Sequence, residues 1–260
     1  MKIIINGIYG RMGRMILETA TEFPFADVIC GFDSAEPPAE PVTFKGKEIP
    51  VYKCPDDFIG SADVIIDFSH FSAVPSLLFY AAEKKIPVVI CTTALEDEAK
   101  TAMKKAAAEI AVFNSANMSL GINVMKKMAQ CAMPAFEDNF NVEIVEKHHN
   151  QKLDSPSGTA LMLADAINEA CDTDKKYIYG RHGKDDSVKI TDMGIHSVRG
   201  GTLPGEHTIL FAGKDEVLEI THRVFSRKVF AVGALSAAVF ISDKNPGMYS
   251  MEDLVEGKEE

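Results

Sequence analysis

The chain has 260 residues, of which 46% are hydrophobic and 25% charged, enough for one large or two moderate globular domains. Its formal net charge of -11 at pH 7 disfavours partners such as nucleic acid or an anionic membrane. The sequence shows no signal peptide, no apolar run as long as a membrane span and no CxxC pair among its five cysteines. We therefore expect a soluble, cytoplasmic protein with reduced thiols.

The first 117 residues alternate between short apolar strands and helices. The predicted strands are KIIIN, DVICGFD, ADVIIDFS, PVVICTT and IAVFNSANM, and the predicted helices are RMILETATEF, AVPSLLFYAAEKK and EDEAKTAMKKAAAE. The first helix has a candidate buried stripe of Met15, Ile16, Thr19 and Ala20. Alternating strands and helices of this kind predict an α/β fold with a parallel, doubly wound sheet.

The pattern changes near residue 120. A long helix, LGINVMKKMAQCAMPAFE, precedes the alternating strand NVEIVEKHH and the helix SGTALMLADAINEA. The segments SVKITDMGIHSVRGG, HTILFAG and EVLEITHRVFS predict a mixed or antiparallel sheet, and FAVGALSAAVFIS predicts a final helix. We expect a first domain over 1–119, a second α+β domain over 120–227, and a C-terminal helical segment over about 228–260 that returns to the first domain. The final EGKEE reads as a solvated end.

Glycines occur at three-residue intervals between the first strand and the first helix. Gly7, Gly10 and Gly13 permit a tight turn and let the backbone approach a pyrophosphate, which the helix N-terminus attracts. Asp33 ends the second strand about 20 residues later, where an acid commonly binds the adenosine ribose. This placement indicates a dinucleotide site, the alternative being a turn that only packs the helix on the sheet. Tyr9 stands where the common fingerprint has a glycine.

The acid also bears on the choice of cofactor. Asp33 is followed by Ser34, and an acid without an adjacent arginine repels a 2'-phosphate. The cofactor is therefore NADH or NADPH, with NADH favoured. Cations that would still allow NADPH are Arg11, Arg14, Lys45 and Lys47.

Two further loops follow strands of the predicted sheet. They are Cys91-Thr92-Thr93 and Ser115-Ala116-Asn117-Met118. Ligands of open α/β sheets bind at this edge, and small hydroxyl and amide groups suit the nicotinamide and its ribose. Ordinary strand-ending caps explain the two loops equally well.

The stretch EKHHNQKLDSPSGTA, residues 146–160, concentrates titratable groups before a helix. His148 and His149 end a strand and point to opposite faces, while Lys152 follows in the loop. Histidine is a natural proton carrier at neutral pH, and lysine binds carboxylates. Ser155 or Ser157 caps the next helix, where Gly158 and Thr159 form an anion cup.

These groups combine a proton donor, a cation and a carboxylate cradle. The alternative is a structural histidine beside a simple helix cap. A zinc site is disfavoured because adjacent histidines diverge on a strand and no cysteine has ligand spacing, so we expect no metal. A later stretch, HSVRGGTLPGEHT, supplies His196, Arg199, Glu206 and His207. Arg199 either binds a second carboxylate or pairs with Glu206.

In the order GIYGRMG, DFS, CTT, NMSLGIN, EKHHNQKLDSPSGTA, HSVRGGTLPGEHT and THRVFSRKVFAVGAL, these motifs span nearly the whole chain. The sequence resembles the 4-hydroxy-tetrahydrodipicolinate reductase (dihydrodipicolinate reductase) family of lysine and diaminopimelate synthesis. The resemblance implies a Rossmann-like first domain, and a second domain that binds a cyclic imine dicarboxylate and builds a homotetramer. It implies NAD(P)H-dependent reduction of 4-hydroxy-tetrahydrodipicolinate to tetrahydrodipicolinate.

The resemblance also implies roles for individual residues. His148 is the proton donor or acceptor, Lys152 a second donor, His149 a substrate contact, and Gly158 with Thr159 the carboxylate cradle. The implied cofactor residues are Gly7, Ile8, Tyr9, Gly10, Arg11, Met12, Asp33, Cys91, Thr92, Thr93, Ser115, Ala116, Asn117 and Met118. Cys91 and Ala94 depart from the family, which has glycine at both positions. The rival functions are another nicotinamide-dependent dehydrogenase, of a semialdehyde or an amino acid, and a non-catalytic dinucleotide-sensing regulator.

Overall fold

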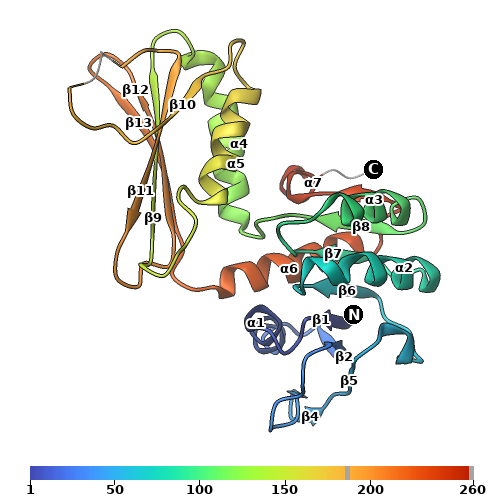
Figure 1. Cartoon of the computed structure of the whole chain (residues 1–260). Coiled ribbons are helices and arrows are strands. Elements are labelled where there is room, and N and C mark those ends of the chain that lie inside the picture. The colour runs from blue at the N-terminus through green and yellow to red at the C-terminus, as the bar shows by residue number, and fades with distance from the viewer. Residues whose placement is uncertain (185–187, 258–260) are drawn as a thin grey trace. The chain divides into compact units, whose positions relative to one another are not determined.

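The computed structural model describes residues 1–184 and 188–257. Its internal contacts divide the chain into two compact units, coloured along the chain in Figure 1. Unit 1 comprises Met1–Leu120 and the chain from Arg227 onward, and unit 2 comprises Gly121–Ser226. The helix predicted to return to the first domain, α6 (Lys228–Ile241), belongs to unit 1.

Unit 1 is built on a parallel sheet. Within the described residues the sheet has seven strands, and every neighbouring pair is parallel. Their order is β14 (Gly247–Tyr249), β8 (Ala111–Asn114), β7 (Val88–Ile90), β6 (Val64–Asp67), β1 (Lys2–Asn6), β2 (Asp27–Phe32) and β5 (Val51–Tyr52). The chain passes from β1 to β2 on one side and later to β6 on the other. This reversal places a ligand crevice at the carboxyl end of β1.

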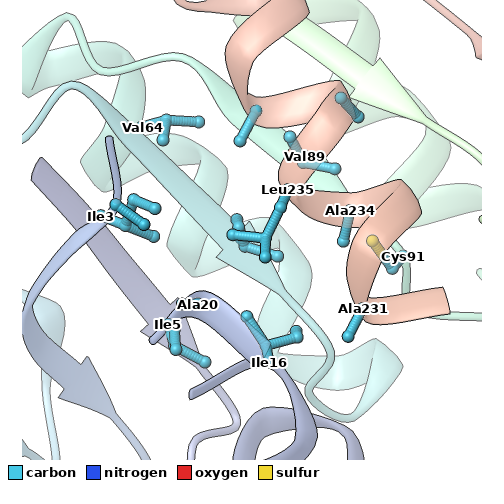
Figure 2. Packing of buried hydrophobic residues seen from close by; sticks show 14 of the residues in the cluster. Ile3, Ile5, Ile16, Ala20, Val64, Val89, Cys91, Ala231, Ala234 and Leu235 are labelled. Carbon is cyan, nitrogen blue, oxygen red and sulfur yellow. The ribbon is translucent and has the colours of Figure 1, made fainter. Parts of the chain in front are cut away.

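Helices cover both faces of this sheet, which confirms the predicted doubly wound α/β fold. Ile3 and Ile5 of β1 pack towards α1 (Arg11–Ala20) and α6, as Figure 2 shows for part of the cluster. Ile4 points to the opposite face, towards α2 (Val74–Lys84) and α3 (Asp97–Ala106). All three isoleucines are fully buried, and burial of each such side chain stabilises the fold by roughly 1.5–3 kcal/mol.

Smaller elements complete unit 1. They are the hairpin strands β3 (Thr43–Phe44) and β4 (Lys47–Glu48), the 3-10 turns η1 (Pro55–Asp57) and η2 (Phe71–Ala73), and α7 (Met251–Glu256). The first residue of the predicted EGKEE tail is therefore helical, because Glu256 ends α7. Residues 258–260 lie outside the described part of the chain.

Unit 2 contains the predicted mixed sheet. Its strand order is β10 (Lys176–Tyr179), β11 (Asp192–Arg199), β9 (Asn141–His148), β12 (Glu206–Ala212) and β13 (Val217–Arg223). The first three strands are parallel, and β12 runs antiparallel to both its neighbours. The strand predicted from residue 187 begins at Asp192, and Ser187 itself lies outside the described residues.

Two helices cover one face of the unit 2 sheet. Apolar residues of α4 (Leu120–Phe136) and α5 (Gly158–Glu169) form a core with β9, β11 and β12. Along β9, alternate residues face this core, and they include Val142 and Ile144. The same alternation continues to Glu146 and His148 at the carboxyl end of the strand, and both are buried. No helix in the described part of either unit is long and apolar enough to cross a membrane.

Candidate active site

The glycine turn of unit 1 has the shape that a phosphate cradle needs. Gly7 has a φ of +79°, and a Cβ there would lie 2.7 Å from the backbone oxygen of Phe68. A Cβ on Gly13 would lie 2.2 Å from the oxygen of Gly7. Gly10 is the N-cap of α1 and offers no side-chain cap, so the helix N-terminus is left to an external anion. The helix starts at Arg11, three residues before the predicted start, and Gly13 lies inside it.

Asp33 lies beside this turn. Its carboxylate accepts hydrogen bonds from the N–H groups of Tyr9 (2.9 Å) and Ala35 (3.0 Å). Asp33, Gly7, Tyr9 and Gly10 line one pocket of about 550 Å³, with Lys53 and His70 on its wall. The pocket, the turn and the acid fit the adenosine diphosphate part of a dinucleotide. Two of the predicted NADPH-compatible cations are engaged elsewhere: Arg14 donates to the Tyr9 oxygen and Lys45 to the Ala26 oxygen.

A buried acid that the sequence did not reveal holds the Thr92 loop, one of the two remaining cofactor loops. Asp67, at the end of β6, accepts hydrogen bonds from Asn6 (2.7 Å) and from the hydroxyls of Ser69 and Thr92 (both 2.6 Å). Burial raises the pKa of Asp67, and these hydrogen bonds oppose that shift. The carboxyl ends of β1, β6 and β7 are thus tied together. The motif DFS was visible in the sequence, but an acid ending an apolar strand gave no sign of its partners.

The other predicted cofactor residues differ in their surroundings. Thr93 and Ala116 line a hollow of about 290 Å³ with Thr92, and Arg11 is exposed at the start of α1. The side chains of Ile8, Met12, Cys91 and Met118 instead pack in or against the core, and Cys91 is labelled in Figure 2. Burial raises the pKa of the Cys91 thiol well above its usual value. Ser115 and Asn117 stabilise their own loop: Ser115 Oγ donates a hydrogen bond to the Asn117 backbone oxygen and accepts one from the Asn117 N–H.

In unit 2, the histidine segment is organised by Glu146, which is fully buried. Its Oε2 lies 2.5 Å from His148 Nδ1 and 2.7 Å from Arg199 Nη1. Its Oε1 accepts from Arg199 Nη2 (2.6 Å) and from the N–H of Ser157 (3.1 Å). Burial opposes ionisation of Glu146, but the bonds from Arg199 and His148 outweigh it and lower its pKa to about 2. The carboxylate is therefore charged at neutral pH.

Of the two alternatives left open for Arg199, the pair with Glu206 is excluded, because Glu206 binds Lys147 and Arg223 instead. The guanidinium is committed to Glu146 and to the backbone oxygen of Asp154. A bidentate pair across neighbouring parallel strands was not predictable, because 53 residues separate its members in the sequence.

His148 and His149 diverge as expected for a strand end. His148 faces the core side and is 9% exposed, whereas His149 is half-buried. Burial lowers the pKa of His148, Glu146 opposes this shift, and the charges of Lys152 and Arg199 add to it. His149 Nδ1 is buried and makes no hydrogen bond within the described residues. Such a nitrogen is destabilising until a ligand or water satisfies it.

The predicted carboxylate cradle holds one of the chain's own acids. Lys152 Nζ lies 2.9 Å from Asp154 Oδ1. This contact, with a smaller effect from the Gly158 N–H, lowers the pKa of Asp154. The space beside the Gly158 Cα is open, and Gly158 is exposed, whereas Thr159 is half-buried. Lys152 thus already binds a carboxylate in the loop that leads to the N-terminus of α5.

Ser157, rather than Ser155, caps α5, and it links the cradle to His207. Ser157 Oγ accepts from the Ala160 N–H (3.1 Å) and lies 2.9 Å from His207 Nε2. Burial lowers the pKa of His207 to about 3, with the nearby His148 adding to the shift. His207 is therefore neutral, and its Nε2 shares a hydrogen bond with the Ser157 hydroxyl. Its ring lies 5.1 Å from that of His148.

Comparisons with known proteins identify the family. The family model described as dihydrodipicolinate reductase, N-terminus, matches residues 1–118, and the model described as dihydrodipicolinate reductase, C-terminus, matches residues 121–255. A relative from Caldanaerobacter subterraneus subsp. tengcongensis, named 4-hydroxy-tetrahydrodipicolinate reductase, is 47% identical over 98% of both chains. One of the same name from Clostridium botulinum is 40% identical over 98% of both chains.

A solved structure shares the fold. The dipicolinate-bound dihydrodipicolinate reductase from Paenisporosarcina sp. TG-14 superposes with a TM-score of 0.80 at 24% identity, covering 96% of this chain and 97% of its own. Fold and matches together define a pyridine-nucleotide-dependent oxidoreductase, which confirms the predicted class of enzyme. Within that class, the chain belongs to the dihydrodipicolinate reductase family.

Proposed function

We propose that the chain reduces 4-hydroxy-tetrahydrodipicolinate to tetrahydrodipicolinate in lysine and diaminopimelate biosynthesis, in the cytoplasm. The observation that carries this proposal is the edge of unit 2, where His148, Lys152 and the α5 N-terminus meet beside a charged Glu146. A cyclic imine with two carboxylates needs both a proton donor and a cation with free N–H groups. The relatives' names and the dipicolinate-bound neighbour support a ring dicarboxylate as the substrate class.

Unit 1 would hold the cofactor, because its features fit a dinucleotide. The glycine turn and the N-terminus of α1 would bind the pyrophosphate, and Asp33 the adenosine ribose. The loops that contain Thr92, Thr93 and Ser115–Met118 would surround the nicotinamide end. NADH is favoured over NADPH, because a 2'-phosphate would meet the carboxylate of Asp33. Lys53, a cation on the same pocket wall, is paired with Glu36.

Unit 2 would bind the substrate and supply the proton. When bound, the nicotinamide cofactor supplies a hydride. The N-terminus of α5 at Gly158 and Thr159, with Lys152, would orient one substrate carboxylate in place of the Asp154 side chain. His149 would contact the substrate through its unsatisfied ring nitrogen. His148 is the preferred proton donor and Lys152 the second candidate, since both lie at the same edge.

We also propose that unit 2 assembles the chain into a homotetramer. One face of its sheet carries the core, and the opposite face presents exposed apolar side chains such as Val198 and Val217. Exposed valines scattered singly are ordinary on a protein surface; what supports assembly is the open sheet face, which α4 and α5 leave uncovered. Sedimentation equilibrium should give four times the chain mass of 28.4 kDa, and a monomer at micromolar concentration would contradict the assembly.

The direct test of the function is a coupled assay. The substrate is generated enzymatically from pyruvate and aspartate semialdehyde by a dihydrodipicolinate synthase, and oxidation of NADH or NADPH is followed at 340 nm. We expect synthase-dependent oxidation with a higher kcat/KM for NADH. Replacing Asp33 with Ser should narrow or reverse that preference. Oxidation that does not depend on the synthase, or that needs a semialdehyde alone, would favour another dehydrogenase.

A further inference from the structure

The strand β9 carries two carboxylates that each contact a histidine and an arginine but lie on opposite faces of the sheet. Glu146 contacts His148 and Arg199, and Glu143 contacts His196 (2.7 Å) and Arg181 (2.6 Å). Only Glu146 is fully buried, and only its histidine lies at the proposed catalytic edge. The chain therefore contains a candidate positioning group and a natural control for it on one strand.

The contact with Glu146 determines which nitrogen of His148 carries the first proton. An ionised carboxylate only accepts hydrogen bonds, so Nδ1, at 2.5 Å from Glu146 Oε2, must be the protonated nitrogen of the neutral ring. Nε2 makes no hydrogen bond within the described residues. Gly205 leaves it uncovered, since a Cβ there would lie 3.3 Å from Nε2. The free nitrogen is therefore the one that can gain and donate a second proton.

The orientation is fixed because Glu146 is itself held on several sides. Arg199 binds both carboxylate oxygens, and the Ser157 N–H binds one of them at the start of α5. The guanidinium is anchored in turn by the Asp154 backbone oxygen at 2.7 Å. A buried carboxylate with this many donors has little freedom to rotate and stays ionised. It thus connects the histidine with the loop that forms the substrate cradle.

We infer that Glu146 is a positioning residue, which holds the Nδ1 proton of His148 and leaves Nε2 as the atom that donates a proton to the substrate. In the step, the Nε2–H bond of the imidazolium breaks, its electron pair stays on the ring, and the proton bonds to the substrate. The Nδ1 proton stays on the ring, hydrogen-bonded to Glu146, and is not transferred to the carboxylate. This inference rests on the proposed function, in which His148 is the donor.

The charged groups around His148 predict how the pH profile responds. Glu146 on β9 favours the imidazolium form of His148, whereas Lys152 in the loop and Arg199 on β11 disfavour it. Asp154, beside Lys152, is a second acid. The His207 ring of β12 is neutral. A proton donor loses activity as pH rises through its pKa. Removing the charge of Glu146 lowers the pKa of His148, so this basic limb should move to lower pH.

The test compares Glu146→Gln with the matched control Glu143→Gln. We expect Glu146→Gln to lower kcat by about 10- to 100-fold, to change KM by less than about 3-fold, and to shift the basic limb of the kcat profile to lower pH. Glu143→Gln should retain the wild-type kcat and profile. Equal losses in both variants, or a loss without a shifted limb, would make Glu146 merely structural and overturn the inference.

A second measurement does not depend on any variant folding or on turnover. Ring ¹⁵N shifts of wild-type protein labelled at histidine, with His148→Gln used to assign the signal, report the His148 tautomer. The Nδ1–H form above its pKa is expected, and the Nε2–H form would overturn the inference. If the coupled assay shows no reduction while the Nδ1–H form is present, the proposed function fails and the positioning contact stands.

Discussion

His148 and Lys152 lie at the same edge of unit 2 but in different surroundings, so their replacements should have different effects. His148 is held by Glu146, and its role is proton transfer. His148→Gln should lower kcat by roughly 10²- to 10⁴-fold and leave the NADH dissociation constant within about 2-fold, measured by fluorescence titration. A variant as active as the wild type would remove His148 from the reaction.

Lys152 should act on binding as well as on turnover. Its ammonium already pairs with one carboxylate, that of Asp154, and we expect it to exchange this partner for a substrate carboxylate. Lys152→Met should raise KM for the substrate by about 10- to 100-fold, the equivalent of one charge-assisted hydrogen bond, and should also lower kcat. Lys176→Met, at an exposed edge-strand position, is the control. An unchanged KM in Lys152→Met would exclude the carboxylate contact.

Ala94 stands where the family resemblance implies a glycine, and the backbone at this position makes the departure testable. Its φ is +55°, a left-handed conformation that costs a residue with a Cβ about 1 kcal/mol or more. Ala94→Gly should therefore raise the free energy of unfolding of unit 1 by about 0.5–1 kcal/mol, measured by chemical denaturation. In α3, where the backbone is helical, Ala102→Gly should lower it by about 1 kcal/mol. A destabilised Ala94→Gly would show that the methyl group packs favourably in the adjoining hollow.

At the scale of elements, α6 shows how a segment distant in sequence completes the core of unit 1. Leu235 is fully buried against β1 and α1 residues, whereas Val239, one turn later, is 47% exposed. Leu235→Ala should lower the free energy of unfolding by about 2–5 kcal/mol, and Val239→Ala by less than about 1 kcal/mol. Similar losses at both positions in thermal or urea unfolding would contradict the packing in Figure 2.

The elements that could be predicted from sequence are those with a strong local pattern. The run of isoleucines predicted β1, and the alternation of apolar and polar residues predicted β9. Because a helix follows each strand, these two predictions also placed the glycine turn and the histidine segment at strand ends. The strands β10 and β14 were missed, because three or four residues carry too little periodicity. The start of α1 at Arg11 was missed because glycines argue against a helix, although here Gly13 is needed for close packing on the turn.

The candidate site was predictable only as far as its residues lie close in sequence. His148, Lys152 and Gly158 belong to one motif, so their meeting followed from a strand, a loop and a helix in succession. Glu146 is in the same motif, yet its role depends on Arg199, which β11 brings alongside β9. The link between Asp67 and Thr92 likewise depends on neighbouring strands of the sheet. Such pairings are set by strand order and register, which residue spacing does not contain.

For the whole molecule, the buried titratable groups make the two units respond differently to acid. In unit 1, burial raises the pKa of Asp67, so its contribution to stability is lost as pH rises through the folded-state value and is present in acid. In unit 2, the pKa of His207 falls from 6.5 to about 3 and that of Glu146 from 4.5 to about 2. For both groups the unfolded chain binds a proton that the folded unit does not, so stability falls on acidification. Unit 2 should therefore weaken first.

His207 makes this difference measurable between pH 7 and pH 5. Below 6.5 the free energy of unfolding of unit 2 should fall by up to about 1.4 kcal/mol per pH unit through this residue, or about 2 kcal/mol by pH 5. In His207→Gln, whose side-chain amide can still hydrogen-bond the Ser157 hydroxyl, that part of the pH dependence should vanish. Hydrogen exchange of β12 peptides, corrected for intrinsic rates, measures it, with β6 peptides of unit 1 as the internal control. An equal pH dependence in wild type and His207→Gln would mean that His207 is protonated as readily in the folded unit as in the unfolded chain. That result would contradict the low pKa expected from its burial beside His148.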